Sequence, residues 1–203
     1  MKSRPFRILL CTLAILLGAE FSAAATLQSA ERAYKQKDYA TAFRGFTALA
    51  RRGNPEAEFY LGKMYMLGQG VLKEEPEAIR WFKASADQGN ADAQFFLGSI
   101  YYLPHKDVPR GLMWLKLSAE QGNRDAELLL GQAYMQGLKS LPRNPIQAEK
   151  WLRLAARDNL PFYKDQLLAA ERQMNAVQIE AGRALAARWK PKHGLKPPAS
   201  PGS

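Results

Sequence analysis

Cysteine and histidine are scarce in this chain of 203 residues, which contains one cysteine and two histidines. Cys11 lies in the apolar part of a predicted export signal, so the exported protein is expected to contain no thiol. This excludes a disulfide scaffold, a thiol oxidoreductase and a cysteine-ligated zinc protein. His105 and His193 are far apart and no carboxylate follows either at ligand spacing, so neither a metal site nor a catalytic triad is predicted.

The apolar run near the N-terminus is too short to cross a membrane comfortably, because a spanning helix needs about 20 apolar residues. Residues 1–25 instead have the three parts of an export signal: basic residues at the start, an apolar run over 8–19, and small residues up to Ala25. We expect cleavage after Ala25. The signal resembles a bacterial one, which places the mature protein in the periplasm or outside the cell.

Acidic residues are outnumbered by basic ones, 19 to 29, which gives a formal charge of +10. Removing residues 1–25, which contain three basic residues and Glu20, leaves +8. The basic residues are scattered without interleaved aromatics, so nucleic acid is not predicted as a partner. They are interpreted either as a solvated surface or as a weak attraction to an anionic envelope surface, to which the basic tail over 190–203 contributes most.

No pattern typical of catalysis or cofactor binding is present. The carboxylates of Glu74, Glu75 and Glu77 stand where a helix begins, and negative side chains are favoured there electrostatically. The turn over 68–70 has two glycines but no following Lys-Ser/Thr pair, so it is not a phosphate-binding loop. The prediction is a protein without catalytic residues and without a cofactor.

What the chain does contain is a repeat. The pattern Ala-x-x-x-Leu-Gly-x-x-Tyr occurs three times, beginning at Ala57, Ala93 and Ala126, which are 36 and 33 residues apart. Each copy is followed by a second block that contains a tryptophan, at Trp81, Trp114 or Trp151. The alanine, leucine and tyrosine positions form one stripe of a helix. Each repeat is therefore expected to be a pair of helices.

The glycine of the pattern indicates close contact between the two helices, because glycine inside a helix costs about 1 kcal/mol relative to alanine. The tryptophan of the second helix is expected to be the bulky partner of this glycine. Glycines at the ends of the second helices, each followed by an asparagine that caps the next helix, predict the boundaries. These pairs are Gly53-Asn54, Gly89-Asn90 and Gly122-Asn123.

Two further segments flank the three repeats over 54–159. Residues 26–53 align with the pattern as a degenerate helix pair, and residues 160–189 are predicted to form a helical cap in which Asn175 and Gln178 make a capping box. The tail over 190–203 has four prolines and is expected to be unfolded. The predicted fold is all-α: an α-solenoid of four helix-turn-helix repeats with a C-terminal helical cap.

These residues resemble the Sel1-like repeat, a relative of the tetratricopeptide repeat, whose pattern the segment 57–89 matches nearly throughout. The second repeat departs from it, with Gly111 where alanine is usual and no Gly-x-Gly loop. The resemblance implies an α-solenoid that serves in protein–protein interaction and has no catalysis of its own.

In stacks of this kind the first helices line the concave surface, so variable positions there are candidates for binding a partner protein. Apolar side chains flank a polar row at the positions Tyr60, Lys63, Met66, Phe96, Ser99, Tyr102, Leu129, Gln132 and Met135. The alternative is that Tyr60, Phe96 and Leu129 pack between neighbouring repeats. The function predicted is an exported interaction scaffold, with a cell-wall or anionic-surface binding protein as the alternative.

Overall fold

The computed structural model describes residues 26–103 and 107–198, and within them the chain forms ten helices and no strand. The one isolated β-bridge joins Leu138 and Leu141 in a loop. The predicted signal peptide with its cleavage position at Ala25, and also His105, lie outside the described residues. In chain order the helices are α2 (Leu27–Lys35), α3 (Tyr39–Ala50), α4 (Pro55–Leu67), α5 (Glu75–Asp87), α6 (Ala91–Tyr102), α7 (Val108–Glu120), α8 (Arg124–Gln136), α9 (Pro145–Ala155), α10 (Pro161–Glu171) and α11 (Ala176–Arg188).

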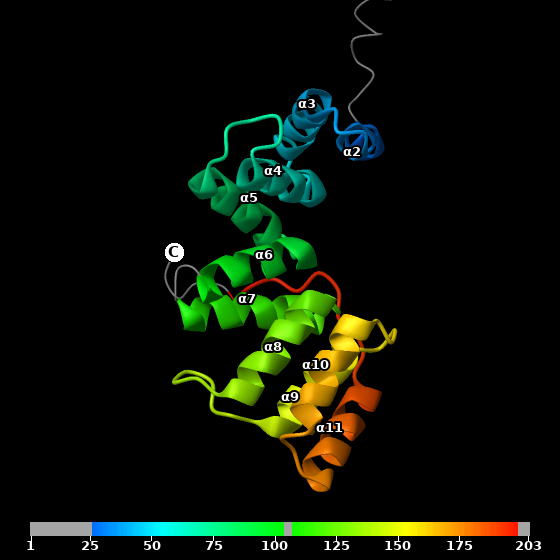
Figure 1. Ribbon diagram of the computed structural model, residues 1–203. Coiled ribbons are helices and arrows are strands. Elements are labelled where there is room, and N and C mark those ends of the chain that lie inside the picture. Colours follow the sequence, from blue (N-terminus) through cyan, green and yellow to red (C-terminus); the bar gives the residue numbers. More distant parts are fainter. Residues whose placement is uncertain (1–25, 104–106, 199–203) are drawn as a thin grey trace, which may run out of the picture.

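Successive helices pair as hairpins, α2 with α3, α4 with α5, α6 with α7 and α8 with α9, and each hairpin packs on the next one along the chain. The result is an elongated stack (Figure 1). The helices α10 and α11 both pack on α9 and close the C-terminal end of the stack. The prediction of an all-α solenoid of four helix pairs with a helical cap is confirmed.

Glycine-asparagine pairs mark the boundaries between the hairpins, as predicted. The side chains of Asn54, Asn90 and Asn123 accept hydrogen bonds from the backbone N–H three residues on, at 2.8 to 3.0 Å, and so cap α4, α6 and α8. The preceding glycines have φ between +76° and +97°. Asn159 replaces that glycine after α9 and also has a positive φ, of +54°. The capping box of Asn175 and Gln178 begins α11.

The glycine of each repeat meets a different partner from the one predicted. A Cβ on Gly62 would lie 2.6 Å from a ring atom of Phe82, and a Cβ on Gly131 would lie 2.7 Å from Leu152. In the second repeat Leu115 takes this place opposite Gly98. The side chain that fills the space is thus the residue after each tryptophan, and the prediction that the tryptophan fills it is wrong.

The tryptophans pack between neighbouring repeats instead. Trp114 is 3% exposed and lies in a core cluster with Phe59 and Leu97 of the preceding helices. Trp151 is 2% exposed and lies with Leu115 and Leu130. Successive residues on one helix point about 100° apart, so one large residue can close the hairpin while its neighbour joins that hairpin to the previous one.

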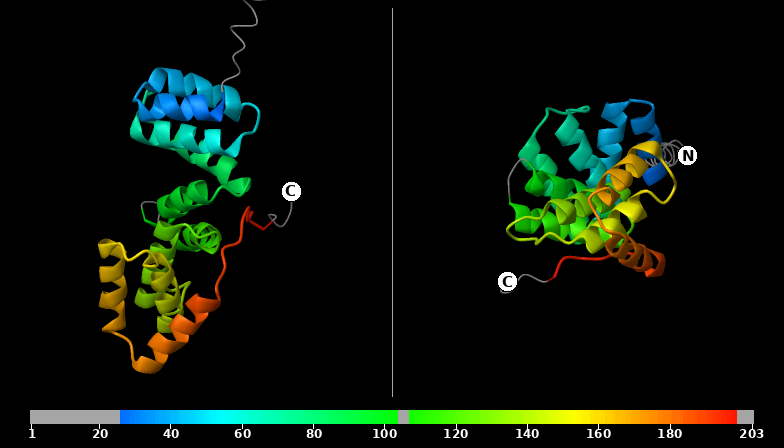
Figure 2. Two further views of the ribbon diagram at one scale, coloured as in Figure 1. Left: turned by 90° about the vertical axis from the view of Figure 1, so that its right-hand side faces the viewer. Right: turned by 60° about the horizontal axis from the view of Figure 1, so that its bottom comes forward.

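The tail is also different from the prediction. Residues 189–198, here called the tail segment, leave α11 and run back in extended form beside α7 and α6 (Figure 2, red). Lys192 N–H donates to the Glu120 carbonyl at 2.9 Å, and the Gln94 side chain donates to the Leu195 carbonyl at 2.6 Å. The expectation of an unfolded tail is therefore wrong for residues 190–198, because side chains of the repeats bind backbone groups of the tail.

Candidate functional site

The nine predicted groove residues lie on the first helices of the three repeats, and all nine are half-buried. Tyr60, Lys63 and Met66 are on α4; Phe96, Ser99 and Tyr102 are on α6; Leu129, Gln132 and Met135 are on α8. Several of them contact the neighbouring repeat. Their role in binding a partner stays a prediction.

The aromatic positions act mainly as spacers between repeats. The Tyr60 ring stacks on Phe46 with centroids 4.5 Å apart and an interplanar angle of 3°. The Phe96 ring stacks on Phe82 at 5.1 Å and 14°. Leu129 likewise packs against the core of α7 to α9. Burial raises the pKa of the Tyr60 phenol. These contacts agree with the alternative interpretation of packing between repeats.

Two members of the polar row, Lys63 and Ser99, are also partly enclosed by the fold. The Lys63 ammonium lies 5.4 Å from the ring centroids of Tyr34, Phe59 and Tyr60, within the range of a cation–π contact. The Ser99 Oγ is buried and has no hydrogen-bond partner within the described residues.

Gln132 and Met135, the groove residues nearest the C-terminus, differ from the others because they line a hollow. Gln132 and Met135 line a hollow of about 420 Å³ between α8 and α10, here called the glutamine hollow. Gln132 donates from Nε2 to Gln166 Oε1 of α10 at 2.9 Å. The whole lining consists of Gln132, Met135, Gln136, Leu152, Gln166, Ala169, Ala170 and Gln173. The residues of α10 could not be predicted, because they follow the last repeat and match no motif.

The chemistry of the glutamine hollow suits binding rather than catalysis. Its polar groups are carboxamides, each of which can donate and accept hydrogen bonds, and its floor is apolar. None of its lining residues ionises near neutral pH, so the hollow itself supplies no general acid or base. Such a surface matches the uncharged amides of a peptide backbone or of polar side chains.

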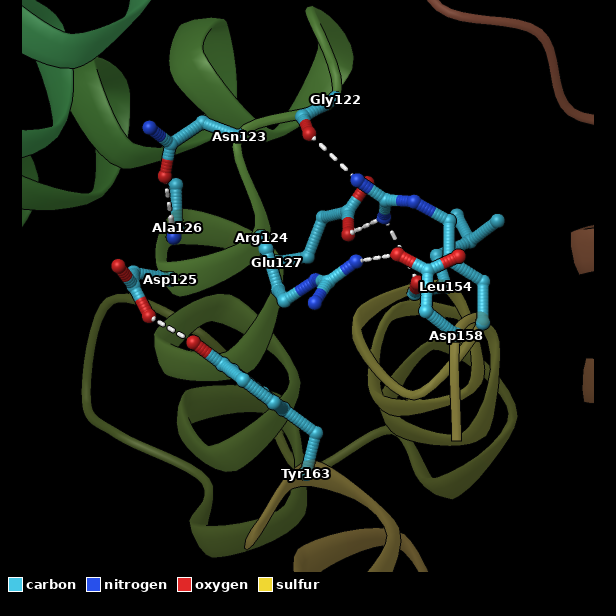
Figure 3. A network of polar contacts seen from close by, with 10 residues as sticks. Gly122, Asn123, Arg124, Asp125, Ala126, Glu127, Leu154, Asp158 and Tyr163 are labelled. Atoms are coloured by element: carbon cyan, nitrogen blue, oxygen red, sulfur yellow. Dashed lines mark hydrogen bonds and ion pairs between the residues drawn. The ribbon is translucent and has the colours of Figure 1, made fainter. Parts of the chain in front are cut away.

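A polar network on the neighbouring face holds α8, α9 and α10 together (Figure 3). The carboxylate of Glu127 is fully buried and accepts a hydrogen bond from Arg157, which also donates to the carbonyls of Gly122 and Leu154 at 2.8 and 2.7 Å. Arg124 pairs with Asp158, and Tyr163 donates to Asp125. Through the bond from Tyr163 to Asp125, the network joins α8 to α10, which supplies one wall of the glutamine hollow.

Glu127 is the strongly perturbed carboxyl of this network. Burial raises its pKa to about 7, and the positive charges of Arg157, Arg124 and Lys150 oppose that rise. Perturbed carboxyls often mark active sites, but this one is enclosed by structural partners. The equivalent positions of the other two repeats hold Glu58, bonded to Gln88 at 2.7 Å, and Gln94. Each of these side chains therefore bonds to a residue just after the second helix of its own repeat.

Clusters of metal-ligating side chains and apolar helices of membrane-spanning length are both absent from the described ranges 26–103 and 107–198. There, no three histidine, cysteine or acidic side chains gather in a way that could hold a metal ion. No helix of that part of the chain has the length and apolar content needed to cross a bilayer. His193, the described histidine, is exposed in the tail segment.

Comparison with known proteins places this architecture in a family. The model of the Sel1 repeat matches residues 55–90, 91–123 and 124–160, which correspond to the three hairpins α4–α5, α6–α7 and α8–α9. None of the curated proteins matches the chain in sequence.

Among solved structures, a Sel1 repeat protein from Oxalobacter formigenes is similar, with 28% identity and a TM-score of 0.65 over 70% of this chain and 59% of that one. A protective antigen of uropathogenic Escherichia coli, described as displaying an SLR fold, has 25% identity and a TM-score of 0.44, over 72% of this chain and 40% of that one. The chain thus spans about three-fifths of the first protein and two-fifths of the second. With three matched repeats covering more than half of its length, this chain belongs to the Sel1 repeat family.

Proposed function

We propose that this protein is an exported, non-catalytic scaffold that binds a partner protein at the glutamine hollow and the adjacent part of α8. The observation that carries the proposal is the convergence of Gln132, Gln136, Gln166 and Gln173 around an apolar floor. Family membership supports it, because the repeat supplies stacking positions and leaves a few variable positions free for recognition. The partner would present an extended segment or a helix with polar groups toward the amides.

Site-specific crosslinking tests this assignment. A photoreactive amino acid in place of Gln136, which is exposed at the hollow, is expected to crosslink to one protein in the cell that makes this chain. The matched control carries the same group in place of Arg44, which is exposed on α3. Identical crosslinked products from both positions, or products from Arg44 alone, would contradict a binding site at the hollow.

The export part of the proposal rests on the composition of residues 1–25. Thr26 accepts a hydrogen bond from Ser29 N–H and caps α2, so cleavage after Ala25 leaves the first helix with its cap. The intact mass of the protein recovered from the producing cell is expected to correspond to a chain that begins at Thr26. Full-length protein in the cytoplasmic fraction would contradict export.

The anionic-surface alternative has less support from the side-chain contacts. Arg153 pairs with Glu149 and Glu171, and Arg157 with Glu127, so part of the positive charge is neutralised within the fold. Lys190 and Lys196 of the tail segment remain exposed. Sedimentation with anionic vesicles at low and high salt separates the two functions, because only surface attraction is lost at high salt.

A further inference from the structure

The tail segment lies on a site whose side chains form hydrogen bonds with its peptide backbone. Leu195 is held at both of its backbone groups: its N–H donates to Gln121 Oε1 at 3.3 Å, and its carbonyl accepts from Gln94 Nε2 at 2.6 Å. The two glutamines are joined to each other, because Gln121 Nε2 donates to Gln94 Oε1 at 2.8 Å. Gln94 is fully buried. Two side-chain amides of one hairpin, Gln94 on α6 and Gln121 at the end of α7, thus hold one residue of an extended chain.

The chemistry of this pair is specific to the second repeat. The equivalent pairs elsewhere are Glu58 with Gln88 and Glu127 with Arg157. A carboxylate has no hydrogen to donate, so only a buried amide can bind a peptide carbonyl from this position. One hydrogen of Gln94 Nε2 is used by the Ala86 carbonyl at 3.1 Å, which leaves the other for the tail. Without a carbonyl there, a buried donor would lose its partner.

The site contacts the backbone of the tail segment more than its side chains, so it is expected to recognise backbone conformation. A Cβ on Gly89 would lie 2.8 Å from the Gly194 carbonyl carbon, so the two backbones touch, and Gly194 has a φ of +65°. The side chains of Lys190, Lys192, His193 and Lys196 are exposed, although Lys192 also pairs with Glu120 at 3.2 Å. Beyond Leu195, the tail reaches a hollow of about 400 Å³ that Trp114, Met113, Pro197 and Pro198 line in part.

We propose that the face of α5 to α7 around Gln94 and Gln121 is a binding site for an extended peptide of a partner protein, which the tail segment occupies in its absence. The partner peptide has a glycine that contacts Gly89, then a residue held by the two glutamines, then proline or another flat apolar residue near Trp114. The lysines of the tail indicate that a basic peptide is accepted. This site is separate from the glutamine hollow, so either assignment can fail alone.

The experiment uses the full chain and a fluorescent peptide with the sequence of residues 189–198. The tail-release variant combines Gly194→Val with Leu195→Pro, which removes the N–H that binds Gln121 and disfavours the positive φ at position 194. Because the tethered tail competes at a high effective concentration, the peptide is expected to bind this variant at least tenfold more tightly than the original chain.

Two controls make the result specific to the site. Adding Gln94→Leu to the tail-release variant is expected to weaken peptide binding at least tenfold, while circular dichroism shows that the helices persist. A peptide with proline in place of Leu195 is expected not to bind. Equal binding by the original chain and the tail-release variant, or by the variants with and without Gln94, would overturn the proposal. A dimer of the original chain that disappears in the tail-release variant would also overturn it, since the site would then exchange tails between copies.

Discussion

Replacing Gly111 by alanine is expected to destabilise the fold by about 2 kcal/mol, although alanine favours helices. A Cβ at this position would lie 2.6 Å from the Tyr102 backbone nitrogen and 2.8 Å from its Cα. A backbone cannot rotate away as a side chain can, so α6 and α7 must move apart. This cost outweighs the gain of about 1 kcal/mol in helix propensity. Thermal unfolding is expected to shift downward by roughly 4–8 °C, at about 2–4 °C per kcal/mol.

The matched control is Ala184→Gly, at an exposed position in the middle of α11. This substitution lowers helix propensity, and the exposed side chain of Ala184 makes no close packing contact that the change would disturb. The loss of stability that it causes, expected to be about 1 kcal/mol, therefore measures the effect of helix propensity alone. If Gly111→Ala instead raised the midpoint of unfolding, the close approach of α6 and α7 would be contradicted. The family pattern has alanine at this position, and contact with the Tyr102 backbone is the physical reason for glycine here.

Replacing Glu127 by glutamine is expected to remove a pH dependence of about 3 kcal/mol from the stability of the protein. The pKa of Glu127 is raised from 4.5 to about 7 in the folded chain. As the pH rises between these values, the unfolded chain releases this proton first, so unfolding becomes easier. The stabilisation is complete below pH 4.5 and is lost as the pH passes through 7. Urea unfolding from pH 4.5 to 8 measures the difference between the two proteins.

Glutamine is a suitable replacement because Gln94 occupies the equivalent position in the second repeat. Arg157 keeps the carbonyls of Gly122 and Leu154 as acceptors, so it is not left without partners. The control is Glu180→Gln, which removes one charge from an exposed position on α11. Parallel stability curves for the original protein and the Glu127→Gln variant would show that the carboxyl titrates normally, against our expectation.

The parts of the fold that local chemistry determines could be predicted from the sequence. An asparagine cap or a glycine with positive φ acts within a few residues, so Gly89 and Asn90 locate a helix boundary without reference to the rest of the chain. The partner of Gly62 could not be chosen in this way. Trp81 and Phe82 are adjacent and both large, and only the position of the preceding hairpin decides which of them faces the glycine.

The candidate site was less predictable for the same reason. Tyr60 and Phe96 are variable, apolar and on the expected helices, but Phe46 and Phe82 cover one face of each ring. Gln166 lies on α10 and Gln173 in the turn after it, beyond the repeats, where no motif assigns a role. The composition of the tail predicted an unfolded segment, because it carries no information about the two glutamines, 101 and 74 residues before Leu195, that bind its backbone.

The contact between Gln94 and Leu195 also bears on the order in which the molecule folds. The contacts among the helices lie mostly within a hairpin or between neighbouring hairpins and give a low contact order, which favours fast folding. Joining two residues 101 positions apart is different, because closing so large a loop is entropically costly until the intervening hairpins have already shortened it. The tail segment is therefore expected to dock last, as a separate slow kinetic phase that reports completion of the native state.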